Sequence, residues 1–232
     1  MSPGDVLGEA WALYKRHWRH FLPIAFVVYL LLSLFTLLLA ILLGWFGVIA
    51  GVFVTLAGVF WLQGALVVAI QDVRDGRADL SVGETLSRVR PRLNTLGAAG
   101  ILAAIGILIG LALLIVPGLV LATWWVLIVP VIMLEGQSVL GAFGRSRDLV
   151  RGNGWNVFGL IVLTFLILFA AGILVGIAVF PLDEGLQQFV GNVVSNTIFA
   201  PFVALAFTLA YYRLREAREG RIETGVTAAT PS

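Results

Sequence analysis

Long stretches without a charged residue are the feature that most limits how this chain can fold. Four such stretches cover 21–71, 93–134, 152–182 and 185–212, which together make up most of the 232 residues. Charged residues form only 12% of the chain, whereas soluble domains contain about 25%. A soluble globular fold is therefore excluded, and the sequence predicts an all-α integral membrane protein.

The lengths of these stretches predict six membrane-spanning helices. A helix needs about 20 residues to cross about 30 Å of hydrocarbon, so the first two stretches hold two spans each and the last two hold one each. We expect the turns inside the paired spans at 44–47 and 116–118, where glycine and proline occur. The predicted spans, within a single membrane domain over 1–212, are 21–43, 48–70, 95–116, 118–135, 154–180 and 187–212.

The two ends of the chain need separate interpretation. A cleaved signal peptide is an alternative for the amino-terminal segment, but the apolar run that begins at 21 is far longer than the about 7–15 residues of a signal peptide. We therefore interpret it as the first span. The tail at 213–232 is expected to be short, cytoplasmic and disordered.

The basic residues predict the orientation of the chain. All 15 Lys and Arg residues lie before the first predicted span, between spans two and three, between spans four and five, or after span six. Short loops rich in Lys and Arg stay on the cytoplasmic side of a membrane. Both termini of this multi-pass protein should therefore be cytoplasmic.

Three basic segments share a pattern that predicts a helix at the membrane surface. In each, a serine that can cap a helix precedes apolar residues at helical spacing and a pair of basic residues four apart. Amphipathic helices with arginine on the polar face lie among lipid headgroups. We expect such helices at 3–20, 81–93 and 138–151, so that the fold is three transmembrane hairpins, each preceded by an interfacial helix. The alternative is three ordinary cytoplasmic loops.

Anionic lipid headgroups are the ligands that these segments would bind. Basic residues near a membrane surface are attracted to negatively charged lipids. The predicted headgroup contacts are Lys15, Arg19, Arg88, Arg92, Arg145, Arg147 and Arg151.

The sequence offers few groups for catalysis or metal binding. It contains no cysteine, and none of the common zinc-protease, phosphate-loop or nucleophile-elbow motifs occurs. His17 and His20 have a spacing that could serve a metal, but no third ligand lies near them in the sequence. No ionisable residue lies in the middle of a span, where it would indicate a functional site. We expect no enzymatic activity, no cofactor, no metal and, given a net charge of only +2, no nucleic-acid partner.

A spaced motif of about 40 residues follows the third predicted span. A Pro-Gly pair opens a span that ends in proline and Glu-Gly, and a basic helix with Arg-Ser and a closing glycine comes next. The motif residues are Pro117, Gly118, Pro130, Glu135, Gly136, Ser146 and Gly152. The pattern resembles the membrane domain associated with glycerophosphoryl diester phosphodiesterases and the related YciC-like six-span families. This resemblance implies a bacterial inner, or plasma, membrane protein. It does not imply phosphodiesterase activity, because that activity belongs to a separate fused domain in the family.

The same motif also has a structural interpretation, which we favour over a ligand site. Pro117 and Gly118 would form the outer turn, Pro130 would bend the fourth span, and Glu135 would reach an arginine such as Arg145. Such an ion pair would position the helices more than stabilise them.

Our main functional hypothesis is a non-enzymatic membrane protein that interacts with lipid or acts as a scaffold or regulator at the cytoplasmic leaflet. Its expected partners are membrane lipids and a further membrane protein. The alternative is a transporter or permease for a lipid or small amphiphile, which the repeated hairpins and the polar residues Asn192, Ser195 and Asn196 of the sixth span favour. A third interpretation is an accessory subunit of an ATP-driven exporter or a membrane-stress factor.

Overall fold

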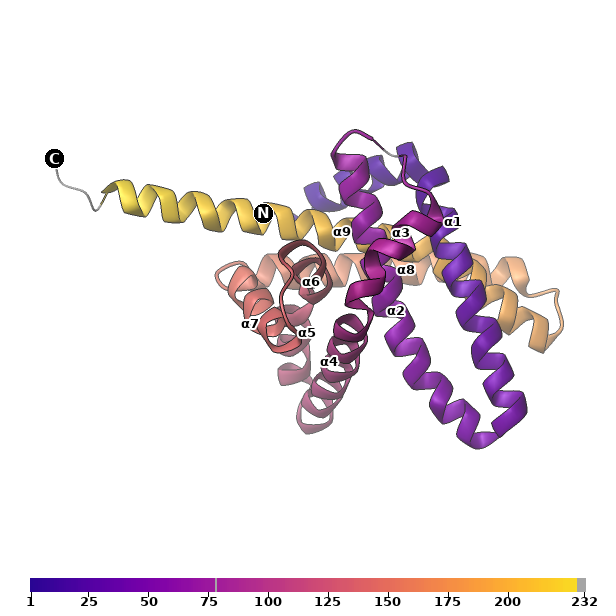
Figure 1. Ribbon diagram of the computed structural model, residues 1–232. Helices are drawn as coiled ribbons and strands as arrows, with labels where there is room; N and C mark the ends of the chain where they lie inside the picture. Colours follow the sequence, from indigo (N-terminus) through magenta and orange to yellow (C-terminus); the bar gives the residue numbers. More distant parts are fainter. Residues whose placement is uncertain (78, 229–232) are drawn as a thin grey trace.

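Helices make up most of the part of the chain that the structure describes. The computed structural model covers residues 1–77 and 79–228, and no strand occurs among them (Figure 1). The predicted all-α class is therefore confirmed. The helices are α1 (Pro3–Leu43), α2 (Trp45–Arg74), α3 (Val82–Val89), the 3-10 turn η1 (Arg90–Arg92), α4 (Leu93–Leu113), α5 (Ile115–Trp125), α6 (Ile128–Glu135), α7 (Val139–Val150), α8 (Gly154–Val179) and α9 (Glu184–Ala228).

Six helical segments among the described residues are long and apolar enough to cross a membrane. Two of them combine consecutive elements, because α3, η1 and α4 form the third segment and α5 and α6 form the fourth. This number agrees with the prediction and is expected of a multi-pass membrane protein. The segments are Pro3–Leu43, Trp45–Arg74, Val82–Leu113, Ile115–Glu135, Gly154–Val179 and Gly185–Glu219.

A single glycine makes the turn between α1 and α2. Gly44 has a φ of 54°, a conformation that side chains other than glycine rarely adopt. Close by, Gly47 lies against the backbone of Leu39, so closely that a Cβ atom would have no room. The turn therefore lies within the predicted interval of 44–47, and glycine is required there for both backbone conformation and contact.

The turn between α4 and α5 lies earlier than predicted. Leu114 is extended, with a φ of −160° and a ψ of 142°, and α5 already begins at Ile115. The prediction of a turn at Pro117 and Gly118 is therefore wrong. Proline is tolerated in the first turn of a helix, since the N–H group it lacks has no partner there. Pro117 thus marks the start of a helix and not the turn itself.

Gly118 instead allows α5 to lie directly against α4. A Cβ atom at Gly118 would lie 2.7 Å from the backbone nitrogen of Leu111, and one at Gly110 would lie 2.9 Å from the Cα of Gly118. Two backbones this close leave no space for a side chain between them. Small residues of this kind allow close helix packing within a membrane.

The three segments for which we predict surface helices are helical in the structure. His17 interrupts α1 with non-helical angles, a φ of −121° and a ψ of 23°, so the first turns of α1 are set off from the apolar remainder. The second helix is α3, which Pro91 converts into the 3-10 turn η1 before α4 begins. The third is α7, whose predicted cap, Ser138, accepts a hydrogen bond of 3.3 Å from the Gly141 N–H.

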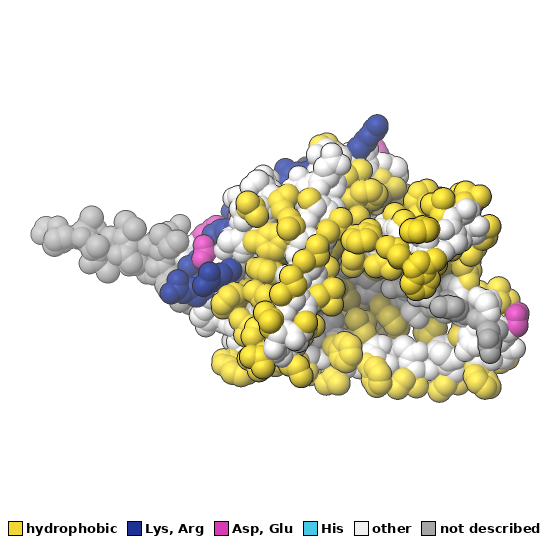
Figure 2. Space-filling view, turned by 90° about the horizontal axis from the view of Figure 1, so that it is seen from below, with side chains coloured by type: hydrophobic (Ala, Val, Ile, Leu, Met, Phe, Trp, Pro, Cys, Tyr) yellow, Lys and Arg dark blue, Asp and Glu magenta, His cyan; other side chains and the backbone are white. Residues whose placement is uncertain are grey.

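Buried side chains are concentrated at one end of the helices. Many of them come from the first half of α1, the second half of α2 and the second half of α9, and α9 packs along both other helices. Further buried side chains come from α4, α6, α7 and the start of α8. The opposite ends are exposed and apolar, including Leu42, Trp45 and Phe46 at one turn and Leu114 and Ile115 at the other. Seen from below, the surface is covered by hydrophobic side chains, with Lys and Arg near its margin (Figure 2).

The final helix is longer than the sixth predicted span. We expect disorder after Tyr212 from the sequence, whereas α9 continues to Ala228. An ion pair one helical turn apart, between Arg215 and Glu219 at 2.8 Å, supports this continuation. The last four residues of the expected tail lie outside the described part of the chain. In Figure 1 the helix extends well beyond the remaining elements.

Enlarging Gly118 should destabilise the fold. In a Gly118→Ala variant the new methyl group meets the α4 backbone, and we expect a loss of about 1–3 kcal/mol of unfolding free energy, the usual range for overpacking. Unfolding of the full chain in mixed micelles by increasing dodecyl sulfate measures it. Gly144→Ala in α7 is the matched control, since nothing lies within 4 Å of a Cβ atom there. Equal stability of the two variants would contradict the close approach.

Candidate functional site

The first amphipathic segment carries cations beside exposed indole rings. The Lys15 Nζ lies 5.6 Å from the ring centroid of Trp11, and the Arg19 Cζ lies 5.4 Å from that of Trp18. Both rings are about half exposed, at 50% for Trp11 and 46% for Trp18. Tryptophan and basic residues are both typical of the membrane–water boundary. These two predicted headgroup contacts are exposed in the structure.

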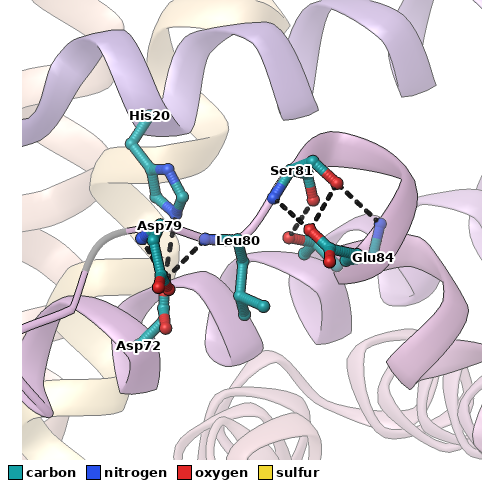
Figure 3. A network of polar contacts seen from close by, with 7 residues as sticks. His20, Asp72, Asp79, Leu80, Ser81 and Glu84 are labelled. Atoms are coloured by element: carbon teal, nitrogen blue, oxygen red, sulfur yellow. Dashed lines mark hydrogen bonds and ion pairs between the residues drawn. The ribbon is translucent and has the colours of Figure 1, made fainter.

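The loop after α2 is fastened by a buried carboxylate. Asp72, with only 6% of its surface exposed, accepts hydrogen bonds from the N–H groups of Asp79 at 3.0 Å and Leu80 at 3.1 Å (Figure 3). The Nε2 of His20, from α1, approaches the same carboxylate oxygen at 3.8 Å. Of the two histidines considered for a metal, His20 thus faces the Asp72 carboxylate, whereas His17 lies near the Leu13 carbonyl of its own helix. The described residues contain no cluster of three metal-binding side chains.

A capping box begins α3. The Ser81 hydroxyl accepts the Glu84 N–H at 3.3 Å, and the Glu84 carboxylate accepts both the Ser81 hydroxyl at 2.6 Å and the Ser81 N–H at 2.9 Å (Figure 3). The predicted start of this helix is confirmed, and Arg88 lies exposed on its last turn.

Arg92 does not point freely toward solvent. Its guanidinium donates hydrogen bonds to the carbonyl of Ile132 and, at 3.2 Å, to that of Met133, both in the last turn of α6. Gly136, with a φ of 71°, ends that helix beside the arginine. The last carbonyls of a helix lack partners further along it. The Ile132 carbonyl also accepts the N–H of the capping Gly136 at 3.2 Å, and Arg92 adds a side-chain donor, so this predicted headgroup contact is used to close α6.

Glu135 joins three helices through two partners. Its carboxylate accepts two hydrogen bonds from the Arg145 Nε of α7, at 2.8 and 3.1 Å, and one from the Tyr211 hydroxyl of α9 at 2.9 Å. The contact with Arg145 agrees with the sequence-based interpretation. Tyr211 is fully buried and was not foreseen, because 76 residues separate it from Glu135.

The fourth apolar segment is interrupted, and a serine side chain hydrogen-bonds backbone groups on both sides of the interruption. Helix α5 ends at Trp125 and α6 begins at Ile128, so that Pro130 lies in the first turn of the new helix. The fully buried Ser146 hydroxyl donates to the Trp124 carbonyl at 2.6 Å and accepts the Leu127 N–H at 3.3 Å. Pro130 thus accompanies a complete interruption and not the bend that was predicted, and Ser146 satisfies one group on each side of it.

A groove of about 680 Å³ lies between α5 and the start of α8. One wall is the apolar surface of α5, and the other is the connection between α7 and α8. Arg147 stacks at 4.5 Å over the ring of Trp124, which lines the groove, and the exposed Arg151 precedes Gly152 in the lining. We call this feature the α5–α8 groove; it is lined by Val116, Leu119, Val120, Thr123, Trp124, Gly152, Asn153, Gly154, Trp155, Asn156 and Phe158.

The predicted residues therefore separate into two groups. Arg92 and Arg145 bind other parts of the chain, together with Glu135, Gly136 and Ser146 of the motif. The other five predicted headgroup contacts are exposed, and two of them adjoin the α5–α8 groove. Pro117 and Gly118 lie apart from the ion pair, at the turn side of α5. The exposed contacts are Lys15, Arg19, Arg88, Arg147 and Arg151.

Comparison with known proteins identifies one family. Residues 16–214 match the model of a family described as a Domain of unknown function (DUF7847). Because the match covers most of the chain, the chain belongs to this family. It shows no link to the phosphodiesterase-associated or YciC-like families. No curated protein and no solved structure matches the chain.

Removing the Ser146 hydroxyl should weaken the junction between α5, α6 and α7. A Ser146→Ala variant leaves a buried carbonyl and an N–H group without this partner, which costs about 1–3 kcal/mol of unfolding free energy. Ser87→Ala is a suitable control, because Ser87 is exposed and bonds only a carbonyl of its own helix. Denaturation in mixed micelles measures both. An unchanged Ser146→Ala stability, or an equal loss in the control, would argue against the bridging role.

Proposed function

We propose that this member of the DUF7847 family is a non-enzymatic membrane protein that binds anionic lipid headgroups through its basic surface segments, as a scaffold or regulator at the cytoplasmic leaflet. The observation that carries the proposal is the pairing of Lys15 and Arg19 with the exposed rings of Trp11 and Trp18. A cation beside an amphipathic ring suits a boundary where one side is apolar and the other is wet. Membrane lipids are the proposed partners, with a further membrane protein recruited at the same face.

The proposed arrangement is three hairpins, each preceded by a surface helix. The part of α1 before His17, then α3 and then α7 would lie along the membrane surface, and the pairs α1–α2, α4–α5 with α6, and α8–α9 would enter it. Support comes from the break in α1 at His17 and from the serine caps of α3 and α7. Exposed apolar residues at the helical turns are also consistent with burial in lipid.

The proposed orientation places both termini in the cytoplasm of a bacterium, with the chain in its inner membrane. The distribution of all 15 basic residues on one side of the spans supports it. The resemblance to the phosphodiesterase-associated membrane domain belongs to this proposal, since it rests on the motif between 116 and 152. The motif side chains Glu135 and Ser146 bind other parts of this chain, which favours a structural role for that motif over a ligand site.

Transport of a lipid or small amphiphile is the second candidate. An open depression of about 420 Å³ between α8 and α9, in which Gln187, Asn192 and Ser195 are the polar residues of the lining, favours it. Movement of a fluorescent phospholipid between leaflets of vesicles that contain the protein separates the two functions. Acceleration over protein-free vesicles would support transport, and equal rates would leave the binding function as the better explanation.

Anionic lipid should be enriched around the full-length protein. In phosphatidylcholine vesicles, the motionally restricted fraction of spin-labelled phosphatidylglycerol should exceed that of labelled phosphatidylcholine. Each basic residue near the surface contributes about 1 kcal/mol to the attraction of anionic lipid. A triple variant with Lys15→Gln, Arg19→Gln and Arg88→Gln should therefore lose most of the preference for phosphatidylglycerol. High salt should do the same, because it screens charge.

The control variant for this experiment keeps the charges and exchanges the side chains, as Lys15→Arg, Arg19→Lys and Arg88→Lys. It should retain the preference for phosphatidylglycerol. Equal restricted fractions for both lipids at low salt in the unmodified protein would refute the proposed function.

A further inference from the structure

The α5–α8 groove has one apolar wall along α5. Val116, Leu119 and Val120 expose their side chains there. The hydroxyl of Thr123 is already bonded to the Leu119 carbonyl at 2.8 Å, so it presents no unsatisfied donor to the groove. This wall suits an alkyl chain, which has no polar group to satisfy.

The opposite wall carries the asparagine side chains of the lining, beside the rings of Trp155 and Phe158. Asn153 lies in the connection between α7 and α8, and Asn156 lies in the first turn of α8. Asn153 occupies the cap position of α8, yet its side chain makes no capping hydrogen bond. The first N–H groups of a helix lack partners within it, and here no capping side chain satisfies them. The lining residues 154–156 therefore carry backbone N–H groups that no capping side chain satisfies.

Two cations adjoin this polar end. Arg147 lies exposed over the Trp124 ring, and Arg151 lies exposed one helical turn later, directly before Gly152. Asp148 is also exposed on α7, but among the described residues no ion pair joins it to either arginine. Both guanidinium groups are thus available to an anion, unlike Arg92 and Arg145.

An exposed indole marks the rim of the groove. Trp155 is 86% exposed and meets Phe158 edge to face, with 6.1 Å between the ring centroids. Tryptophan in this position is typical of the headgroup level of a membrane. The groove volume of about 680 Å³ falls within the range of about 300–1,000 Å³ for ligand sites.

We propose that the α5–α8 groove binds one anionic glycerophospholipid, with an acyl chain against α5 and the phosphate between Arg147, Arg151 and the start of α8. This inference rests on the proposed function, because it takes an anionic lipid as ligand, but it assigns a discrete site with one occupant. Charge complementarity at one end and an apolar wall at the other select a lipid over a soluble anion. Guanidinium groups suit phosphate because they donate paired hydrogen bonds.

Photo-crosslinking of the full-length protein tests this site. A phosphatidylglycerol probe with a diazirine in its acyl chain is added in phosphatidylcholine vesicles, and the labelled peptides are identified by mass spectrometry. We expect label concentrated in 116–124 and 152–158. Label spread evenly over the six apolar helices would overturn the site.

Charge-removing variants test the phosphate contacts. Arg147→Gln with Arg151→Gln should reduce groove labelling about tenfold, the effect of losing a hydrogen bond to a charged group. The matched control, Arg16→Gln with Arg90→Gln, removes two exposed charges that lie in other segments and outside the predicted headgroup contacts, and it should leave groove labelling unchanged. Equal reduction in both double variants would refute a discrete site.

A third variant and two competitors complete the experiment. Leu119→Trp fills the groove while keeping every charge, and it should abolish labelling there. Unlabelled phosphatidylglycerol should compete with the probe, whereas glycerol phosphate should not; equal competition would assign the site to a soluble phosphate and overturn the lipid. If crosslinking labels all helices evenly but the spin-label preference for phosphatidylglycerol is intact, only the groove site is refuted. If crosslinking labels the groove but the spin-label preference is absent, only the broader proposed function is refuted.

Discussion

The break between α5 and α6 sets the strictest requirement in this structure. In an apolar environment no water satisfies a free backbone group, so an interruption of a helix needs partners from elsewhere in the protein. Ser146 provides them for Trp124 and Leu127, and Arg92 provides them for the last turn of α6. The position of α7 against α5 and of η1 against α6 follows from this need. Glu135 then links the same junction to α9 through Tyr211.

The basic residues consequently have two kinds of use. Those that face a helix terminus or a carboxylate hold elements together, as Arg92 and Arg145 do, and Arg213 does the same with Glu9 at 2.5 Å. Among the described contacts, the predicted headgroup residues on the outer surfaces of α1, α3 and α7 form no ion pair, although Arg147 also stacks on the Trp124 ring of α5. Net charge alone cannot separate these uses, because both kinds occur at the same spacing on the same helices. The separation depends on which face of each helix meets the rest of the fold.

Local features of the sequence predicted the architecture well. The length of the uncharged stretches indicated six apolar helices, Gly44 indicated a turn, and Ser81 and Ser138 indicated helix starts, since each depends on neighbours in the chain. The turn at Leu114 was missed because proline can open a helix as well as end one. Tyr211 and the bridging role of Ser146 were missed because their partners are distant in sequence. The α5–α8 groove was not foreseen for the same reason, since it needs the crossing of two helices.

The uneven distribution of buried side chains affects how the molecule keeps its shape. Packing within the protein holds the helices together near the basic segments, while the turn after α1 and the turn after α4 expose large apolar residues such as Trp45 and Ile115. Around those turns, the proposed place in a bilayer would give lipid the position that neighbouring helices have in a tightly packed bundle. The contacts of Gly47 and Gly118 set the distance within each pair of helices, whereas the distance between the two turns would follow the thickness and lateral pressure of the surrounding bilayer.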